Sequence, residues 1–144
     1  MVDRFFGWLA ATALLLAFAG RMAAAAEPVK VVAFGDSTTA TRGPLQVYSQ
    51  ILERELPDRG LTPRIVNAGV GGNNTSQARA RFEADVLKQN PDLVIIQFGI
   101  NDAAVDVWKA PPATTPRIDV ATFRDNLEFF VRELRQRNIR VVLM

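Results

Sequence analysis

The chain has 144 residues, 49% of them hydrophobic and 22% charged, with a formal net charge of +2. This composition suits one folded domain and excludes a disordered chain, and the scattered basic residues exclude a nucleic-acid-binding stripe. The absence of cysteine and histidine excludes disulfides and thiolate or imidazole metal sites, and it removes the commonest general base.

The first 26 residues have the pattern of a secretory signal peptide. Arg4 precedes an apolar run over residues 5–19, and three alanines at positions 24–26 form a small-residue cleavage site. The apolar run is short for a membrane span. We therefore predict cleavage after Ala26 and export to a bacterial periplasm or exterior, with no stable membrane partner afterwards. An uncleaved N-terminal anchor is the alternative.

Residues 27–144 alternate between patterns typical of strands and of helices. Strands are predicted at residues 29–34, 64–68, 92–98 and 139–144, and helices at residues 44–56, from Thr75 or Ser76 to before Pro91, and from Asp119 past Leu134. The unbroken apolar centre of the third strand indicates burial on both faces, as in a parallel sheet. The alternation predicts a three-layer α/β fold with helices on both faces of the sheet. Because the sequence stops within the fourth predicted strand, we expect the domain to continue beyond it.

Polar clusters follow each of the first three predicted strands. They are residues 35–37 (GDS), residues 69–74 (GVGGNN) and residues 99–102 (GIND). Parallel strands carry their carboxyl ends to one edge of a sheet, which is where ligands bind in open α/β sheets. We therefore expect the three clusters to converge on one site.

The residues in these clusters fit acyl transfer. Ser37 is the candidate nucleophile, and a helix starting after it would ease the charge that develops there. Gly72 lets a backbone N–H approach a substrate oxygen, and Asn101 offers a neutral amide donor for an oxyanion. The supporting candidates beside them are Asp36, Asn73 and Asp102.

Each cluster taken alone also has a purely structural interpretation. The first is typical of a turn after a strand, the second of a flexible loop, and Asn101 with Asp102 of a helix cap or an Asx turn. Only their common placement favours catalysis.

The three clusters together resemble the sequence blocks of the SGNH (GDSL-type) hydrolase family of esterases and lipases. The matching segments are residues 34–37, 67–73 and 99–102. The resemblance implies that Ser37 is the nucleophile and that Gly72 and Asn101 complete a Ser/Gly/Asn oxyanion hole. It also implies a flavodoxin-like fold and no cofactor.

The sequence departs from the family pattern in two places. Thr38 stands where the family name implies leucine, at a position that we expect to vary. The family also carries Asp-x-x-His near its C-terminus, whose histidine takes the serine proton, and this sequence has no histidine. We expect the catalytic Asp and His to lie beyond Met144 in a full-length protein, and the 144-residue chain to be inactive or nearly so.

A long connection over residues 103–118 leaves the same edge of the predicted sheet as the candidate site. Trp108 within it is a candidate stacking surface for a sugar ring. The alternative is a passive surface loop with Trp108 packed down on the sheet.

The sequence therefore favours an exported serine esterase that hydrolyses small acyl or carbohydrate O-acetyl esters. The alternative is a non-catalytic ligand- or carbohydrate-binding protein of the same fold. A nucleotide or flavin binder is disfavoured, because residues 69–72 are not a dinucleotide fingerprint and no phosphate-loop lysine follows them. No metal site is predicted, since carboxylates at these spacings are weak ligand sets. The oligomeric state is not predicted.

Overall fold

A computed structural model describes residues 27–144 of the chain. The predicted signal peptide, its cleavage site and the alternative membrane anchor all lie outside the described residues. No helix between residues 27 and 144 is long and apolar enough to cross a membrane. The elements are β1 (Lys30–Gly35), α2 (Tyr48–Glu55), β2 (Arg64–Gly69), α3 (Thr75–Asp85), β3 (Leu93–Gln97), α4 (Ile100–Ala103), α5 (Val120–Gln136) and β4 (Arg140–Leu143), with short 3-10 turns at Pro57–Arg59 and Leu87–Gln89.

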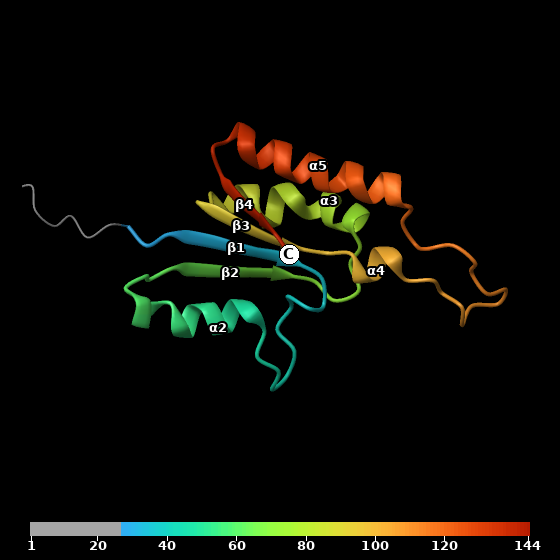
Figure 1. Ribbon diagram of the computed structural model, residues 1–144, viewed down its shortest axis with the longest axis horizontal. Coiled ribbons are helices and arrows are strands. Elements are labelled where there is room, and N and C mark those ends of the chain that lie inside the picture. The colour runs from blue at the N-terminus through green and yellow to red at the C-terminus, as the bar shows by residue number, and fades with distance from the viewer. Residues whose placement is uncertain (1–26) are drawn as a thin grey trace, which may run out of the picture.

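The four strands form one parallel sheet in the order β2-β1-β3-β4. Helix α2 covers one face, while α3 and α5 lie side by side on the other, which confirms the three-layer α/β prediction (Figure 1). From β1 the chain moves outward to β2 and then crosses back to β3 on the other side. The carboxyl ends of β1 and β3 therefore flank the point where the strand order reverses, which is the usual ligand position in such sheets.

Three phenylalanines form the centre of the core between the sheet and its two-helix layer. Phe34 on β1, Phe82 on α3 and Phe130 on α5 are almost fully buried. The Phe34 ring meets the Phe130 ring edge-on at 5.6 Å, and the Phe82 and Phe130 centroids are 4.9 Å apart. Burying one such side chain contributes about 1.5–3 kcal/mol, so this cluster fixes both helices against β1.

The first helix begins later than the sequence predicted, at Tyr48 rather than at Pro44. Gly43 adopts a left-handed φ of 47°, and Arg42 pairs with Leu45 in an isolated bridge. Pro44 therefore lies in a tight turn outside the helix, and Leu45 is 55% exposed. Gly43 adopts the left-handed conformation that this turn requires. The helical spacing of the apolar residues did not predict the turn.

The start of α3 also differs, because Asn74 is the N-cap in place of Thr75 or Ser76. The Asn74 side chain accepts a hydrogen bond from the Gln77 backbone N–H, and the Gln77 side chain accepts one from the Asn74 backbone N–H. This reciprocal pair is a capping box. Helix α5 begins as predicted, with the Asp119 carboxylate accepting from Thr122.

Strand β1 is followed by a tight turn that carries Ser37. Within this turn the Ala40 N–H donates to the Asp36 carbonyl at 2.9 Å. A Cβ added to Gly69 would lie only 2.2 Å from the Ala40 nitrogen, and one added to Gly35 would lie 2.0 Å from Thr39 Oγ1. Glycine at both strand ends therefore allows the turn to pack directly on the backbone of β1 and β2.

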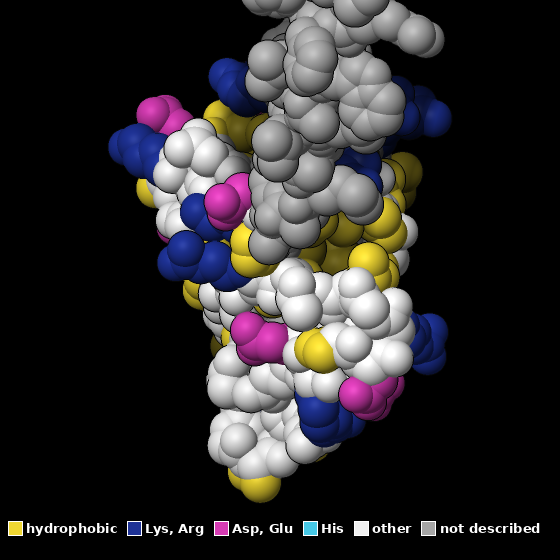
Figure 2. Space-filling view, turned by 90° about the vertical axis from the view of Figure 1, so that its left-hand side faces the viewer, with side chains coloured by type: hydrophobic (Ala, Val, Ile, Leu, Met, Phe, Trp, Pro, Cys, Tyr) yellow, Lys and Arg dark blue, Asp and Glu magenta, His cyan; other side chains and the backbone are white. Residues whose placement is uncertain are grey.

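The opposite face of the molecule, at the amino ends of the strands, is shown in Figure 2. Lysine, arginine and acidic side chains are mixed there with apolar ones. The polar strand-end clusters lie instead at the carboxyl edge, beside α4 and the long loop that follows it (Figure 1).

Gly69→Ala tests the close approach of the turn to β2. Because the added methyl group would meet backbone atoms that cannot move freely, we expect the free energy of unfolding in urea to fall by about 1–3 kcal/mol. Gly71→Ala is the matched control, since its Cβ would meet nothing nearer than Ser37 Cβ at 4.0 Å. Equal stability of the two variants would contradict the described packing.

Candidate active site

Ser37 lies half-buried in the turn that follows β1. Helix α2 begins only at Tyr48, so the predicted contribution of a helix starting directly after Ser37 is wrong. The loop after β2 passes beside the serine, because a Cβ on Gly71 would lie 4.0 Å from Ser37 Cβ. The turn and the loop therefore share the carboxyl edge of the sheet.

Asp36 fixes the turn from within and is only 1% exposed. Its Oδ1 accepts hydrogen bonds from the Thr38 backbone N–H and from Thr38 Oγ1, both at 2.8 Å. The hydroxyl thus gives threonine a role at the position where the family name implies leucine. The bond from the Thr38 N–H to the Asp36 side chain forms an Asx turn, which fixes the backbone conformation around Ser37.

Asn101 joins the three strand-end clusters. It lies in α4, a helix that begins directly after Gly99. The φ of 134° at Gly99 lets the chain turn from β3 into this helix. Asn101 Nδ2 donates to the Asn73 carbonyl at 3.0 Å and makes a longer contact of 3.4 Å with Asp36 Oδ2. The structure therefore brings Asp36, Asn73 and Asn101 together, one from each cluster.

Gly72 occupies the exposed tip of the loop after β2, with a left-handed φ of 78°. No atom lies within 4 Å of a Cβ added there, so the open space in front of its backbone can admit a ligand atom. Residues with a Cβ rarely adopt such a φ, which explains why glycine occupies this position.

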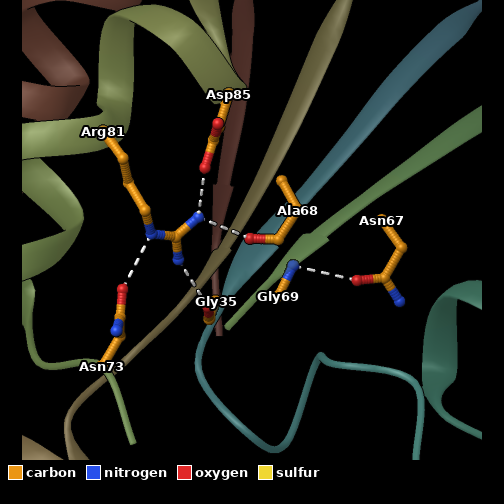
Figure 3. A network of polar contacts seen from close by, with 7 residues as sticks. All are labelled: Gly35, Asn67, Ala68, Gly69, Asn73, Arg81 and Asp85. Atoms are coloured by element: carbon orange, nitrogen blue, oxygen red, sulfur yellow. Dashed lines mark hydrogen bonds and ion pairs between the residues drawn. The ribbon is translucent and has the colours of Figure 1, made fainter. Parts of the chain in front are cut away.

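Arg81 on α3 holds the loop after β2 against the sheet (Figure 3). Its guanidinium donates to the Asn73 side-chain oxygen at 2.8 Å, to the Ala68 carbonyl at 2.8 Å and to the Gly35 carbonyl at 2.9 Å. Asp85 balances its charge at 2.8 Å. None of the strand-end clusters pointed to this residue, although its position three residues after Ala78 on the apolar face of the helix was a signal that it borders that face.

Asp102 has a structural partner rather than a contact with the serine turn. It is 3% exposed, and its Oδ1 accepts hydrogen bonds from the Thr75 backbone N–H at 2.9 Å and from the Thr75 hydroxyl. Asn126 on α5 donates to the same hydroxyl at 3.1 Å. Asp102 thus caps the start of α3 from a different element. A helix cap was one of the two structural interpretations of this cluster, and it applies to Asp102.

The loop between α4 and α5 is organised by the buried carboxylate of Asp106. Its Oδ1 accepts from Arg117 Nε at 2.8 Å and Nη2 at 2.6 Å, while its Oδ2 pairs with Lys109 Nζ at 2.7 Å. The hydrogen bonds from Arg117, followed by that from Lys109, lower the pKa of Asp106 from 3.8 to about 2. Arg117 Nη1 also reaches Asn101 Oδ1 at 3.4 Å, which links the loop to the strand-end clusters.

Trp108 is 70% exposed on this loop. The alternative in which Trp108 packs down on the sheet is therefore wrong. The loop is held together by the ion pairs of Asp106 with Lys109 and Arg117. The Arg117 guanidinium lies 5.7 Å from the Trp108 ring centroid. An exposed ring beside a cation is available to a ligand.

Comparison with known proteins gives a consistent result. The profile of the GDSL-like Lipase/Acylhydrolase family matches residues 33–144. The chain is 41% identical over 123 residues to the uncharacterized lipoprotein YqeF of Bacillus subtilis, covering 79% of this chain and 46% of that protein. It is 31% identical over 123 residues to esterase TesA of Pseudomonas aeruginosa, covering 84% and 55%.

Solved structures show the same similarity. The lipase/acylhydrolase from Enterococcus faecalis superposes with a TM-score of 0.65 at 34% identity, covering 80% of this chain and 55% of that one. The acetyl xylan esterase AlAXEase superposes with a TM-score of 0.62 at 33% identity, covering 80% and 57%. The chain thus spans about half the length of the proteins it matches.

The depressed pKa of Asp106 predicts how the free energy of unfolding depends on pH. The carboxylate is a stronger acid in the folded chain than in the unfolded one, so its contribution is complete above about pH 4 and is lost as the pH falls through about 2. Urea unfolding across this range should show the loss in the unmodified protein. Asp106→Asn should flatten that part of the curve, whereas Asp125→Asn on the exposed side of α5 should not; equal slopes in the two variants would contradict the prediction.

Proposed function

The chain belongs to the GDSL-like lipase/acylhydrolase family, and from this premise we propose that it is the nucleophile-bearing part of an exported serine esterase. The proposed substrates are carboxylic esters with a small acyl group, including carbohydrate O-acetyl esters. Two solved or curated relatives named as acetylxylan esterases support that class. The signal-peptide pattern of residues 1–26 supports export, as does the description of one relative as a lipoprotein.

The observation that carries the proposal is the position of the Asn101 amide. Nδ2 has two hydrogens, of which one is used in the 3.0 Å bond to the Asn73 carbonyl. The contact with Asp36 Oδ2 is long, at 3.4 Å, so the second hydrogen can be redirected to a substrate oxygen. An amide held in this way at the edge that carries Ser37 fits the role of an oxyanion donor.

The proposed reaction begins with attack of Ser37 Oγ on the ester carbonyl carbon, while a general base takes the hydroxyl proton. The carbonyl oxygen becomes an oxyanion that accepts hydrogen bonds from the backbone N–H groups of Ser37 and Gly72 and from Asn101 Nδ2. Collapse of this intermediate breaks the ester C–O bond, and the alcohol leaves with the proton. Water then hydrolyses the acyl-serine by the same steps and restores the hydroxyl.

The general base is proposed to be a histidine in an Asp-x-x-His segment beyond Met144. The sequence contains no histidine, and it spans about half the length of its relatives. Sequencing the gene past codon 144 tests this directly. A continuation without Asp-x-x-His, or a stop codon at that point, would contradict the proposed mechanism.

The lack of a histidine favours one second candidate, a binding protein of the same fold that retains the pocket without hydrolysing its ligand. Under that hypothesis a carbohydrate ester would bind and be recovered intact. Product analysis of the full-length protein after incubation with the ester distinguishes the two.

Ser37→Ala and Asn101→Ala test the assigned roles in the full-length protein with p-nitrophenyl acetate. Loss of the nucleophile should reduce hydrolysis to the background rate, while loss of one oxyanion donor should lower kcat by about 10²- to 10³-fold. Gln136→Ala removes an exposed amide at the far end of α5 and serves as the matched control. Full activity of Ser37→Ala would sink the proposal.

Trp108→Ala tests whether the exposed ring contacts the substrate. An aromatic stacking contact is worth about 0.5–1.5 kcal/mol, so KM for an acetylated sugar should rise about two- to tenfold. KM for p-nitrophenyl acetate, which lacks a sugar ring, is the reference. If both KM values stay the same, Trp108 is a passive part of the loop.

A further inference from the structure

A polar pocket of about 500 Å³ opens beside Gly72. The loop after β2 and the start of α3 form one wall through Gly72, Asn74 and Gln77, and the loop between α4 and α5 forms the other through Asp106, Lys109 and Arg117. Because Gly72 belongs both to this pocket and to the proposed oxyanion hole, a ligand can reach from one into the other.

Asp106 holds the two cations of the pocket in place. Its two carboxylate oxygens bind Arg117 at 2.6 Å and Lys109 at 2.7 Å, and its side chain is only 7% exposed. The backbone N–H groups of Lys109 and Ala113 donate to its carbonyl at 3.2 Å. Both cationic groups are therefore positioned before any ligand arrives, which lowers the entropy cost of binding one.

The pocket is rich in unused donors and carries excess positive charge. Two cations face one carboxylate, which leaves one positive charge uncompensated among these three groups. A guanidinium has five N–H donors and an ammonium three. Contacts with the described residues use three of those of Arg117 and one of those of Lys109, so four remain for a ligand.

We propose that this pocket binds a carboxylate carried by the alcohol part of the ester. The protein would then prefer esters whose alcohol carries a carboxylate group over their neutral analogues. The inference rests on the proposed esterase function and adds the charge of the leaving alcohol to it. Paired N–H donors on fixed cations match the oxygens of a carboxylate, and the nearby acyl group would lie between Gly72 and Ser37. Arg117 connects the two regions, since its Nη1 also contacts Asn101 Oδ1.

The test compares two acetyl esters that differ only in charge, 4-acetoxybenzoate and 4-acetoxybenzamide. In the full-length protein, Lys109→Met should lower the ratio of kcat/KM for the charged over the neutral ester by about two- to fivefold, the effect of one partly exposed charge pair. The preference should also weaken as salt is added, because salt screens such charges. Lys88→Met is the matched control and should leave the ratio unchanged. The Lys88 side chain is 69% exposed, against 62% for Lys109, and it lies in the 3-10 turn past the other end of α3.

An unchanged ratio in Lys109→Met would overturn the proposal, as would an equal fall in Lys88→Met. Competitive inhibition by 4-hydroxybenzoate, weaker in Lys109→Met, gives a binding readout that does not depend on turnover. Ser37→Ala separates the two levels of inference. If Ser37→Ala still hydrolyses the ester, the proposed esterase mechanism is wrong. If hydrolysis requires Ser37 but the ratio of kcat/KM values is unchanged in Lys109→Met, only the proposed carboxylate pocket is wrong.

Discussion

The guanidinium of Arg81 determines the shape of the carboxyl edge of the sheet, because it satisfies backbone groups at the ends of two strands at once. Gly35 is the last residue of β1 and Ala68 the last but one of β2, and the carbonyls of both accept hydrogen bonds from Arg81. The Asn73 side-chain oxygen accepts a third. The guanidinium also lies 4.6 Å from the Phe34 ring, at the border of the core. Without it, all three acceptors would lose this donor, although the Gly35 carbonyl would keep a second one, the Val70 backbone N–H at 3.0 Å. A buried acceptor left without any donor costs about 1–3 kcal/mol.

The polar contacts continue from Arg81 across the whole edge. Arg81 holds Asn73, Asn73 holds the Asn101 amide, and Asn101 is linked through Arg117 to Asp106 in the long loop. A donor that is held in place before the reaction needs no reorganisation when charge develops, which is the physical advantage of a preformed oxyanion site. The network therefore couples the serine turn to the loop that is proposed to select the substrate.

The long loop shows how charge can replace packing. Between α4 and α5 it fully buries none of its apolar side chains. Asp106 is buried instead: its carboxylate binds two cations, and its backbone carbonyl accepts from two backbone N–H groups. The Arg117 backbone N–H donates to the Ala104 carbonyl and that of Ile118 to the Asp102 carbonyl, so the loop returns to α4 before α5 begins. Trp108 consequently remains at the surface, where a ligand can meet it.

The sequence by itself determined the strands, the layer order and the convergence of the three strand-end clusters, because these depend on local apolar periodicity and on the shared direction of parallel strands. Only the tertiary structure revealed the turn at Pro44, the roles of Arg81 and Asp106, and the use of Asp102 to cap α3. The turn at Pro44 is local, whereas Arg81 and Asp102 bind groups that are far away along the chain, as Asp102 does with Thr75 across 27 residues. Periodicity records which side of an element is apolar, whereas the pairing of buried charges and amides is decided by the spatial arrangement of the folded chain.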